Sequence, residues 1–461
     1  MTIATINPAT GETLAVYPPM SDAEVDARLD RAVGAARGFG RSGFAARAAV
    51  LVRVAELLEA RLDEIAALVT LEMGKTLAAS RNEVEKCART CRWYAAEAPR
   101  LLADETVAAA AVGADRAFVT HQPLGVILAV MPWNLPIWQV IRYAAPSFMA
   151  GNVTLLKHAD NVPRCAELLE ELFARAGAPD GVFQHLRVET EAVDALIRDR
   201  RVAAVMFTGG STAGTAVAAA AGASLKKSVL ELGGSDPFVV MPSADLDAAA
   251  EVGVRSRCII NGQSCIAAKR FIVHEAVYET FRDRFVDLMA AQRLGDPAES
   301  TTDIGPLARE RGRVHVEALV SDAVGKGARV LCGAERPDRS GWFTPATVIE
   351  GVGSGMAIHR EEAFGPVAAL YRVPDLDAAL RVANDTPYGL GAVLWSADPA
   401  DQERAVTEIE AGSVTVNGMT ISYPELPFGG VKASGYGREL GSVGIREFCN
   451  VKAVWIGPGR A

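Results

Sequence analysis

Residues 202–234 have the sequence VAAVMFTGGSTAGTAVAAAAGASLKKSVLELGG. The apolar run Val202–Phe207 predicts a strand, and the Thr-Gly-Gly that follows it predicts a tight turn. Ala213–Ala223 has the composition of a helix, and Val229–Leu232 predicts a second strand. A strand, a helix and another strand within about thirty residues are typical of an α/β fold with a mostly parallel sheet.

The same alternation continues on both sides of this segment, so the sequence predicts two α/β domains. The N-terminal region is instead helical in pattern, because Ala, Leu and Val recur at helical spacing in Asp22–Arg37 and Phe44–Thr70. Val451–Ile456 predicts a lone strand whose partner could belong to a second subunit. The other expected strands are Val126–Met131, Val153–Leu156, Phe238–Met241, Arg270–Val273 and Ala328–Leu331, and the other expected helices are Ala166–Ala176, Val277–Ala290 and Leu376–Ala383.

Composition narrows the class of protein. Of the 461 residues, 50% are hydrophobic and 22% are charged, which suits a large core without cross-links. The formal net charge of −9 argues against nucleic acid or an anionic membrane as the main partner. No apolar run reaches the roughly 18 residues of a membrane span. The first basic residue is Arg28, so we expect no secretory leader.

The seven cysteines are scattered along the chain, without the spacing of a disulfide framework. This distribution suits a reducing cytoplasm, in which a thiol can be catalytic. The six histidines form no ligand cluster, so no metal site is expected.

Two loops could bind an oxyanion or a phosphate. In Met131-Pro-Trp-Asn-Leu-Pro136, two prolines fix the backbone around Asn134, whose amide could donate to an oxyanion. The alternative is an asparagine that only stabilises a turn. In Phe207–Gly214, a strand ends in glycines before a helix begins, and the free N–H groups of such a helix end can hold a pyrophosphate.

Two further segments could carry reactive groups. Glu231 lies at the end of an apolar strand, where burial should raise its pKa and suit it to general-base or general-acid catalysis. Its alternative role is to bridge the Gly-Gly turn that follows. Cys265 comes after a glycine turn and before a β run, so its sulfur could stand free at a cleft. The alternative is a structural cysteine in the core.

Taken in the order Asn134, Glu231 and Cys265, these segments resemble the aldehyde dehydrogenase superfamily. The resemblance covers essentially the whole chain, and the motifs Leu-Leu-Lys-His-Ala and Leu-Glu-Leu-Gly-Gly-Ser-Asp-Pro-Phe are similar to those of its bacterial succinate-semialdehyde dehydrogenase branch. Further matches are Leu156-Lys157, Glu361–Pro366, Pro427–Lys432 and Ser434–Glu439.

The resemblance implies an α/β aldehyde dehydrogenase-like fold with two parallel-sheet domains and a small β oligomerisation element. Residues 1–102 and 124–233 would form the dinucleotide-binding domain. Residues 234–440 would form the catalytic domain, and 103–123 with 441–461 the oligomerisation element. The protein would be a cytoplasmic homodimer or homotetramer that binds a small aldehyde.

The resemblance also implies the roles of single residues. Cys265 would be the nucleophile, Glu231 the general base and Asn134 the oxyanion donor. Gly210 stands where the family usually has serine, and Ile260 where it usually has asparagine. The implied cofactor-binding residues are Trp133, Lys157, Asp160, Gly209, Gly210, Gly214, Glu231, Leu232, Glu362 and Phe364.

Asp160 suggests which dinucleotide binds. Three residues after Lys157, a carboxylate would accept hydrogen bonds from the ribose hydroxyls and repel a 2′-phosphate. We therefore expect NAD to be preferred, with NADP possible because Lys157 could favour a phosphate. The alternative is that Asp160 only caps the helix that begins near Val162.

Arg142 and Ser422 suggest the substrate. In the resembling enzymes an arginine eight residues after the oxyanion asparagine binds the substrate's distal carboxylate, assisted by a serine. This favours oxidation of succinate semialdehyde to succinate. A structural ion pair of Arg142 is the alternative role. The alternative functions are oxidation of glutarate semialdehyde or a simple aliphatic aldehyde, a CoA-acylating reaction that the presence of Glu231 argues against, and a non-catalytic binding protein on the same fold.

Overall fold

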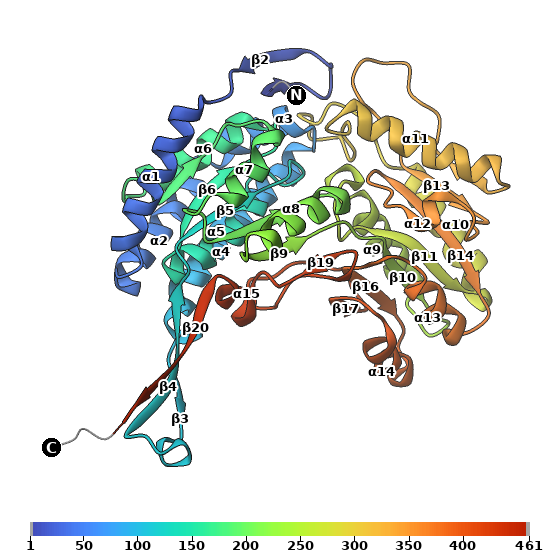
Figure 1. Cartoon of the computed structure of the whole chain (residues 1–461). Helices are drawn as coiled ribbons and strands as arrows, with labels where there is room; N and C mark the ends of the chain where they lie inside the picture. Colours follow the sequence, from blue (N-terminus) through green and yellow to red (C-terminus); the bar gives the residue numbers. More distant parts are fainter. Residues whose placement is uncertain (1–2, 458–461) are drawn as a thin grey trace.

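The computed structural model describes residues 3–457. Residues 1–2 and 458–461, which fall in the ranges predicted for the first domain and the oligomerisation element, lie outside the described residues. Two α/β bodies lie side by side, and a ribbon of strands projects from them (Figure 1). The predicted α/β class with two largely parallel sheets is confirmed, while the predicted domain boundaries stay a prediction.

The first sheet has six strands in the order β19-β9-β8-β5-β6-β7. All of its pairings are parallel except that of β19 with β9. The chain fills one side of β5 with β6 and β7, then crosses to the other side with β8 and β9. The strands are β5 Val126–Val130, β6 Val153–Lys157, β7 Phe183–His185, β8 Ala204–Thr208, β9 Lys227–Glu231 and β19 Gly435–Tyr436.

Helices pack against this sheet and supply most of its apolar core. The helical pattern of Phe44–Thr70 is divided between two helices, because the backbone at Arg61 leaves the helical conformation (φ −112°, ψ 22°). The helices are α1 Asp22–Phe39, α2 Phe44–Ala60, α3 Leu62–Met73, α4 Leu77–Leu101, α5 Trp138–Ala150, α6 Pro163–Arg175, α7 Val193–Arg198, α8 Ser211–Ala223 and α15 Gly441–Glu447.

Two buried glutamates hold the starts of α5 and α6. Glu83 on α4 accepts hydrogen bonds from the backbone N–H groups of Ile137 and Trp138, at 2.8 and 2.7 Å. Glu72 on α3 does the same for the first turn of α6. Since a carboxylate at a helix N-terminus satisfies free N–H groups and opposes the helix dipole, these contacts fix both helices on the sheet. The loop that carries Asn134 is thereby fixed as well.

The second sheet has seven strands in the order β12-β13-β14-β11-β10-β16-β17, parallel except for β12. Its core lies on both faces of the sheet under flanking helices. The strands are β10 Asp236–Val240, β11 Ala268–His274, β12 Arg329–Cys332, β13 Thr347–Glu350, β14 Val367–Val373, β16 Gly391–Trp395 and β17 Ser413–Val416, and the helices are α9 Leu246–Cys258, α10 Tyr278–Ala290, α11 Glu310–Gly325, α12 Ala357–Arg360, α13 Leu376–Asn384 and α14 Pro399–Glu408.

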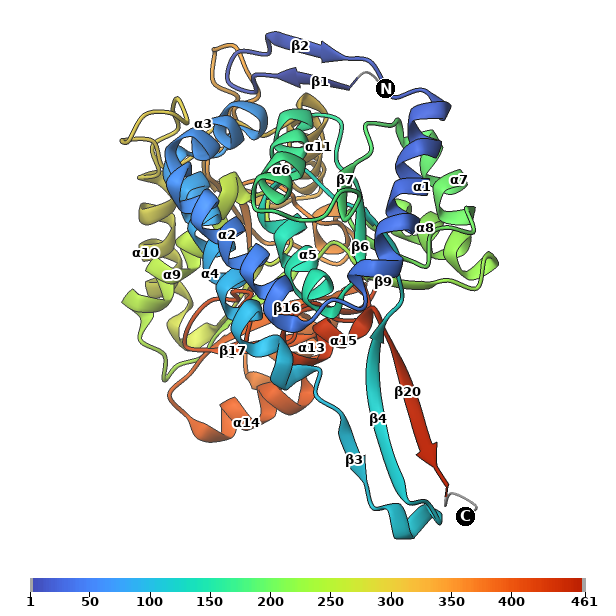
Figure 2. The same cartoon turned by 90° about the vertical axis from the view of Figure 1, so that its left-hand side faces the viewer.

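The C-terminal strand is paired within its own chain. β20, Cys449–Ile456, runs antiparallel to β4, Arg116–Pro123, and β3, Glu105–Val107, pairs with the other edge of β4. The three strands project from the body of the molecule (Figure 2). The strand predicted to need a partner thus finds it in residues 116–123. Two short pairings complete the fold: β1 Ile3–Ile6 with β2 Thr13–Tyr17, and β15 Tyr388–Gly389 with β18 Val431–Lys432.

Candidate active site

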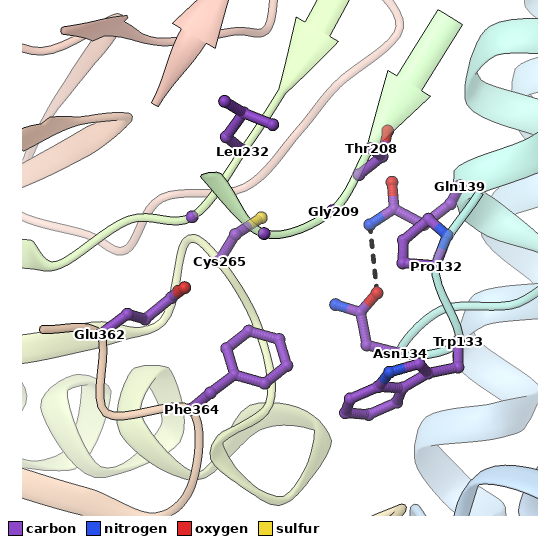
Figure 3. Close-up of a pocket in the computed structure, with 12 residues that line it drawn as sticks. Pro132, Trp133, Asn134, Gln139, Thr208, Gly209, Leu232, Cys265, Glu362 and Phe364 are labelled. Atoms are coloured by element: carbon purple, nitrogen blue, oxygen red, sulfur yellow. Dashed lines mark hydrogen bonds between the residues drawn. The ribbon is translucent and has the colours of Figure 1, made fainter. Parts of the chain in front are cut away.

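A cavity of about 230 Å³ opens where the carboxyl ends of β5, β8 and β9 meet. Strand order reverses at β5, and in open α/β sheets ligands bind at such a switch point. Loops from the second sheet close the opposite wall (Figure 3). The lining residues are Pro132, Trp133, Asn134, Gln139, Thr208, Gly209, Gly210, Leu232, Gly233, Cys265, Glu362 and Phe364.

Asn134 is buried, and its amide is held in one orientation. Its Oδ1 accepts a hydrogen bond from Gln139 Nε2 at 3.5 Å, and its Nδ2 donates to the backbone oxygen of Gln263 at 3.0 Å. The NH₂ group has two hydrogens, so one remains to face the cavity. Gln263 lies two residues before Cys265, so the same contact ties the oxyanion candidate to the loop of the nucleophile candidate.

The loop before Cys265 has an unusual backbone. Ile260, Asn261 and Gly262 all have positive φ, between 55° and 75°. A β-branched residue in this region is strained, and such strain persists only where the surroundings enforce it. Asn261 supplies that support: its Nδ2 donates to the backbone oxygens of Gly74 and Pro306, and its Oδ1 accepts from Gly305. Ile260 stands where the resembling family usually has asparagine, and the hydrogen bonds of Asn261 hold the strained backbone that Ile260 adopts.

The Cys265 thiol is half-buried at the cavity wall. Burial raises its pKa to about 12, and the positive charges of Arg142 and Lys269 oppose that rise. Sequence reasoning missed Lys269, although a lysine in an apolar β run is an unusual feature. Its Nζ donates to the backbone oxygen of Cys265 at 2.7 Å and lies 3.2 Å from Glu362 Oε1.

We expect iodoacetamide to inactivate the cofactor-free enzyme at a rate that rises with pH. The thiolate is the nucleophile, and its fraction grows about tenfold per pH unit at any pH well below the pKa of the thiol. The inactivation rate constant should therefore rise about a hundredfold from pH 7 to pH 9. Residual activity after timed exposure measures it. A plateau below pH 8 would mean that the thiolate is already formed and would contradict the expectation.

Glu231 does not line the cavity. Its side chain is buried beside Gly429, where a Cβ would come within 2.7 Å of Oε1. Burial and the nearby Glu439 carboxyl raise the pKa of Glu231 well above its usual range, and Arg142 opposes them. Neither of its carboxyl oxygens has a hydrogen-bond partner among the described residues. Glu231 therefore does not bridge the Gly-Gly turn that follows it, which was its alternative role.

The glycine turn after β8 lies at the cavity, as a phosphate-binding loop would. A Cβ at Gly210 would meet only open space, and α8 begins there without a side-chain cap, so its first N–H groups remain free. Thr208 Oγ1 is buried without a hydrogen-bond partner and also lines the cavity. Gly214 lies outside the lining, where a Cβ would overlap the Leu232 side chain. The chemistry of this turn fits a dinucleotide phosphate.

Glu362 and Phe364 close the opposite wall, with Trp133 facing them (Figure 3). The Phe364 and Trp133 rings meet edge to face at 5.8 Å between centroids. Glu362 Oε1 accepts a hydrogen bond from the backbone N–H of Gly234 at 3.1 Å, and a side chain at Gly233 would overlap the Glu362 carboxylate. These residues form a slot with aromatic walls and one carboxylate.

Arg142 and Ser422 lie outside the lining. Arg142 is buried and forms an ion pair with Glu439 at 2.5 Å, which is the structural ion pair that the sequence left open. Ser422 Oγ accepts a hydrogen bond from Lys86 Nζ at 2.8 Å. Sequence reasoning missed Lys86, because nothing in its helical surroundings distinguishes it from a surface lysine.

Lys157 and Asp160 are also outside the lining, and they bind each other. Lys157 Nζ lies 2.7 Å from Asp160 Oδ1, and both residues are buried. Helix α6 begins at Pro163 with no side-chain cap from its N-cap residue, and Glu72 satisfies its first turn instead. Asp160 therefore does not act as the helix cap that was the alternative to a ribose contact.

Comparison with known proteins identifies the family. Residues 1–454 match the model of the aldehyde dehydrogenase family. The chain belongs to the aldehyde dehydrogenase family. As a member it is an enzyme that oxidises aldehydes, and a non-catalytic binding protein on this fold is no longer a candidate.

Relatives of this aldehyde dehydrogenase are similar over their full lengths. "Succinate-semialdehyde dehydrogenase [NADP(+)] 1" of Mycobacterium tuberculosis is 57% identical over 456 residues, 99% of this chain and 100% of the relative. "Succinate-semialdehyde dehydrogenase [NADP(+)]" of Mycobacterium avium is 55% identical over 462 residues, 100% of this chain and 98% of the relative. A succinic semialdehyde dehydrogenase from Streptococcus pyogenes, solved with NADP⁺, is 36% identical with a TM-score of 0.96, and the match covers 99% of this chain and 100% of that one.

The predicted preference for NAD is wrong. Both mycobacterial relatives are named as NADP(+) enzymes, and the streptococcal structure holds NADP⁺. The prediction took Asp160 to be a free carboxylate that repels a 2′-phosphate. In the structure its charge is neutralised by Lys157 at 2.7 Å, so the repulsion on which the prediction rested is largely cancelled.

Between residues 3 and 457, no helix is both long and apolar enough to cross a membrane. In the same range no group of three or more histidine, cysteine or acidic side chains is arranged to hold a metal ion.

Proposed function

We propose that this aldehyde dehydrogenase oxidises succinate semialdehyde to succinate with NADP⁺. The observation that carries the reaction type is the placement of Cys265 and Asn134 in one cavity, at the carboxyl ends of the strands of the first sheet. The names of the mycobacterial and streptococcal relatives support the substrate and the cofactor.

The first half of the proposed mechanism belongs to Cys265 and Asn134. The thiol of Cys265 first loses its proton to water, and the thiolate then adds to the aldehyde carbon, so that a C–S bond forms as the C=O π bond breaks and the oxygen becomes an oxyanion. The free hydrogen of Asn134 Nδ2 and the backbone N–H of Cys265 donate to that oxyanion. Because Asn134 is already held by Gln139 and Gln263, its donor is oriented before the substrate arrives. Loss of hydride from the same carbon leaves a thioester on Cys265.

The dinucleotide supplies the hydride acceptor when it is bound. Gly209 and Gly210 would hold its phosphates at the start of α8, and Glu362, Phe364 and Trp133 would position the nicotinamide and its ribose. The adenosine half of the dinucleotide and the glycine turn after β8 would be supported by Lys157, Asp160, Gly214 and Leu232. The uncapped helix start and the unpartnered Thr208 hydroxyl support this assignment.

Glu231 completes the proposed cycle by deacylation. It takes a proton from the water that attacks the thioester, and the carboxylic acid leaves while the thiol of Cys265 is restored. A raised pKa makes Glu231 a stronger base once it is ionised. Its side chain has to turn from Gly429 toward the cavity, and no hydrogen bond holds its oxygens in the present position.

A panel of aldehydes with both dinucleotides tests the proposed function. We expect kcat/KM to be highest for succinate semialdehyde, with butanal as a four-carbon control without the carboxylate and glutarate semialdehyde as the five-carbon competitor. We expect NADP⁺ to give a kcat/KM at least about tenfold above NAD⁺, which is about 1.4 kcal/mol of discrimination. Equal values for butanal and succinate semialdehyde would reject the substrate, and a higher value with NAD⁺ would reject the cofactor.

We also propose that the enzyme works in the cytoplasm as a homo-oligomer. All seven cysteines are free thiols, which supports a reducing compartment. The projecting ribbon of β3, β4 and β20 exposes Val107, Val451, Trp455 and Ile456. An exposed apolar ribbon of this kind supports contact with a second copy.

A further inference from the structure

Lys86 on α4 is a half-buried cation that forms no ion pair with any carboxylate of residues 3–457. Its Nζ donates to Ser422 Oγ at 2.8 Å and lies 4.0 Å from the centre of the Trp138 ring. The neighbouring buried lysine, Lys75, shows the usual arrangement, because it is paired with Glu83. A partly desolvated ammonium without a counter-charge is costly to maintain, so an anion would be bound favourably beside it.

Arg142 adds a second positive charge to the same place. It follows Trp138 by one turn of α5, so the two side chains lie on one face of the helix. Its guanidinium lies over the Phe428 ring at 4.6 Å, and its Nε is buried without a hydrogen-bond partner. Burial first, and then the charge of Arg142, lower the pKa of Lys86 to about 8. Glu439 is the ion-pair partner of Arg142 alone, and it does not pair with Lys86.

This pair of cations lies beside the catalytic cavity. The charge of Arg142 acts on the pKa of the Cys265 thiol as well as on that of Lys86. Gln139, adjacent to Trp138 in α5, lines the cavity and holds Asn134. Neither Lys86 nor Arg142 lines the cavity, so a substrate with its aldehyde at Cys265 has to extend its acidic group past Gln139 to reach Lys86.

We propose that Lys86 binds the distal carboxylate of the substrate and thereby selects a short aldehyde that ends in a carboxylate over one that ends in a methyl group. One carboxylate oxygen accepts from Lys86 Nζ. The other accepts from the hydroxyl of Ser422, which now only accepts from Lys86 and has its own hydrogen to donate. Arg142 contributes its charge and its unpartnered Nε–H. This assignment rests on the proposed oxidation of succinate semialdehyde.

The test compares Lys86→Met with Arg89→Met, which removes an exposed cation one turn further along α4. For Lys86→Met we expect kcat/KM for succinate semialdehyde to fall by about 10- to 150-fold, mainly through KM, since a charge-assisted contact is lost. The value for butanal should stay within about twofold, and Arg89→Met should leave both within about twofold. Lys86→Arg keeps the cation and should recover most of the activity. Equal losses on both aldehydes, or no loss on succinate semialdehyde, would overturn the proposal.

Inhibition by succinate separates this proposal from the proposed function. With butanal as the substrate, succinate should inhibit the wild-type enzyme competitively, and its inhibition constant should rise at least tenfold in Lys86→Met. If the wild type does not prefer succinate semialdehyde but succinate inhibition weakens in the variant, the proposed substrate is wrong and Lys86 still binds a carboxylate. An unchanged inhibition constant would reject the role of Lys86 whatever the preferred aldehyde. The unfolding temperature of each variant checks that the fold is retained.

Discussion

Replacing Cys265 by alanine is expected to lower kcat for aldehyde oxidation by about 10⁴-fold or more, because no other group can form the thioester. Binding of NADP⁺ should stay within about twofold of the wild type, since the glycine turn, Glu362 and Phe364 are untouched. The near-ultraviolet absorbance of the reduced cofactor measures turnover. Quenching of tryptophan fluorescence measures cofactor binding. The Trp133 ring lies in the cavity and provides the signal.

Cys332→Ala is the matched control for loss of a thiol. Cys332 is also half-buried, but it lies on the edge strand β12 of the second sheet. Its variant should keep kcat within about twofold. Wild-type turnover in Cys265→Ala, or loss of turnover in both variants, would remove Cys265 from its assigned role. A variant that loses both turnover and NADP⁺ binding would point to disruption of the cavity instead.

The sequence predicted the fold well where a signal is local, and it marked two candidate reactive residues that the structure brings to one cavity. Alternation of apolar strands with alanine-rich helices is visible within thirty or so residues, and it led to the parallel sheets. Asn134 and Cys265 stand in short segments whose glycines and prolines mark exposed loops at strand ends. The cavity unites these two residues from positions 131 residues apart, which no local pattern could show.

The prediction from sequence was wrong where the chemistry of a side chain depends on the residue that it contacts in the fold. The sequence alone presents Asp160 as a free acceptor for ribose hydroxyls, yet Lys157 binds it at 2.7 Å. Both residues were visible in the sequence, but their rotamers, and therefore their ion pair, were not. The same limit applies to Val451–Ile456, since strand pairing over more than 300 residues of chain depends on the closure of the whole fold.

Lys86 and Lys269 were invisible for a related reason. Lys86 matters because α4 packs against α5 and brings it over Trp138 and beside Ser422. Lys269 matters because β11 begins immediately after the Cys265 loop and turns the ammonium back onto that loop. Helical or strand periodicity places such residues on an element but leaves open what the opposite surface contributes. Cations that act through tertiary contacts were therefore found only in the structure.

Replacing Glu231 by glutamine should block deacylation and leave the first half of the reaction intact. Burial and Glu439 raise the pKa of Glu231 and so disfavour its charge, and glutamine is a neutral side chain of nearly the same shape. The fold and the cavity should therefore survive the substitution. Mixing the variant with succinate semialdehyde and NADP⁺ should give a burst of one NADPH per active site. The steady rate that follows should be lower by about 10²- to 10⁴-fold, the usual contribution of a general base.

The stalled species is the decisive observation. The thioester should accumulate on Cys265, where mass spectrometry of the acid-quenched protein detects the added acyl group. Glu299→Gln is the control, because Glu299 is exposed in the loop between α10 and α11 and its variant should keep the wild-type steady rate. Wild-type steady turnover in Glu231→Gln would reject Glu231 as the deacylation base. A variant with neither burst nor adduct would place the glutamate before the thioester, as the group that takes the proton of Cys265, whose pKa of about 12 leaves the thiol in need of a base.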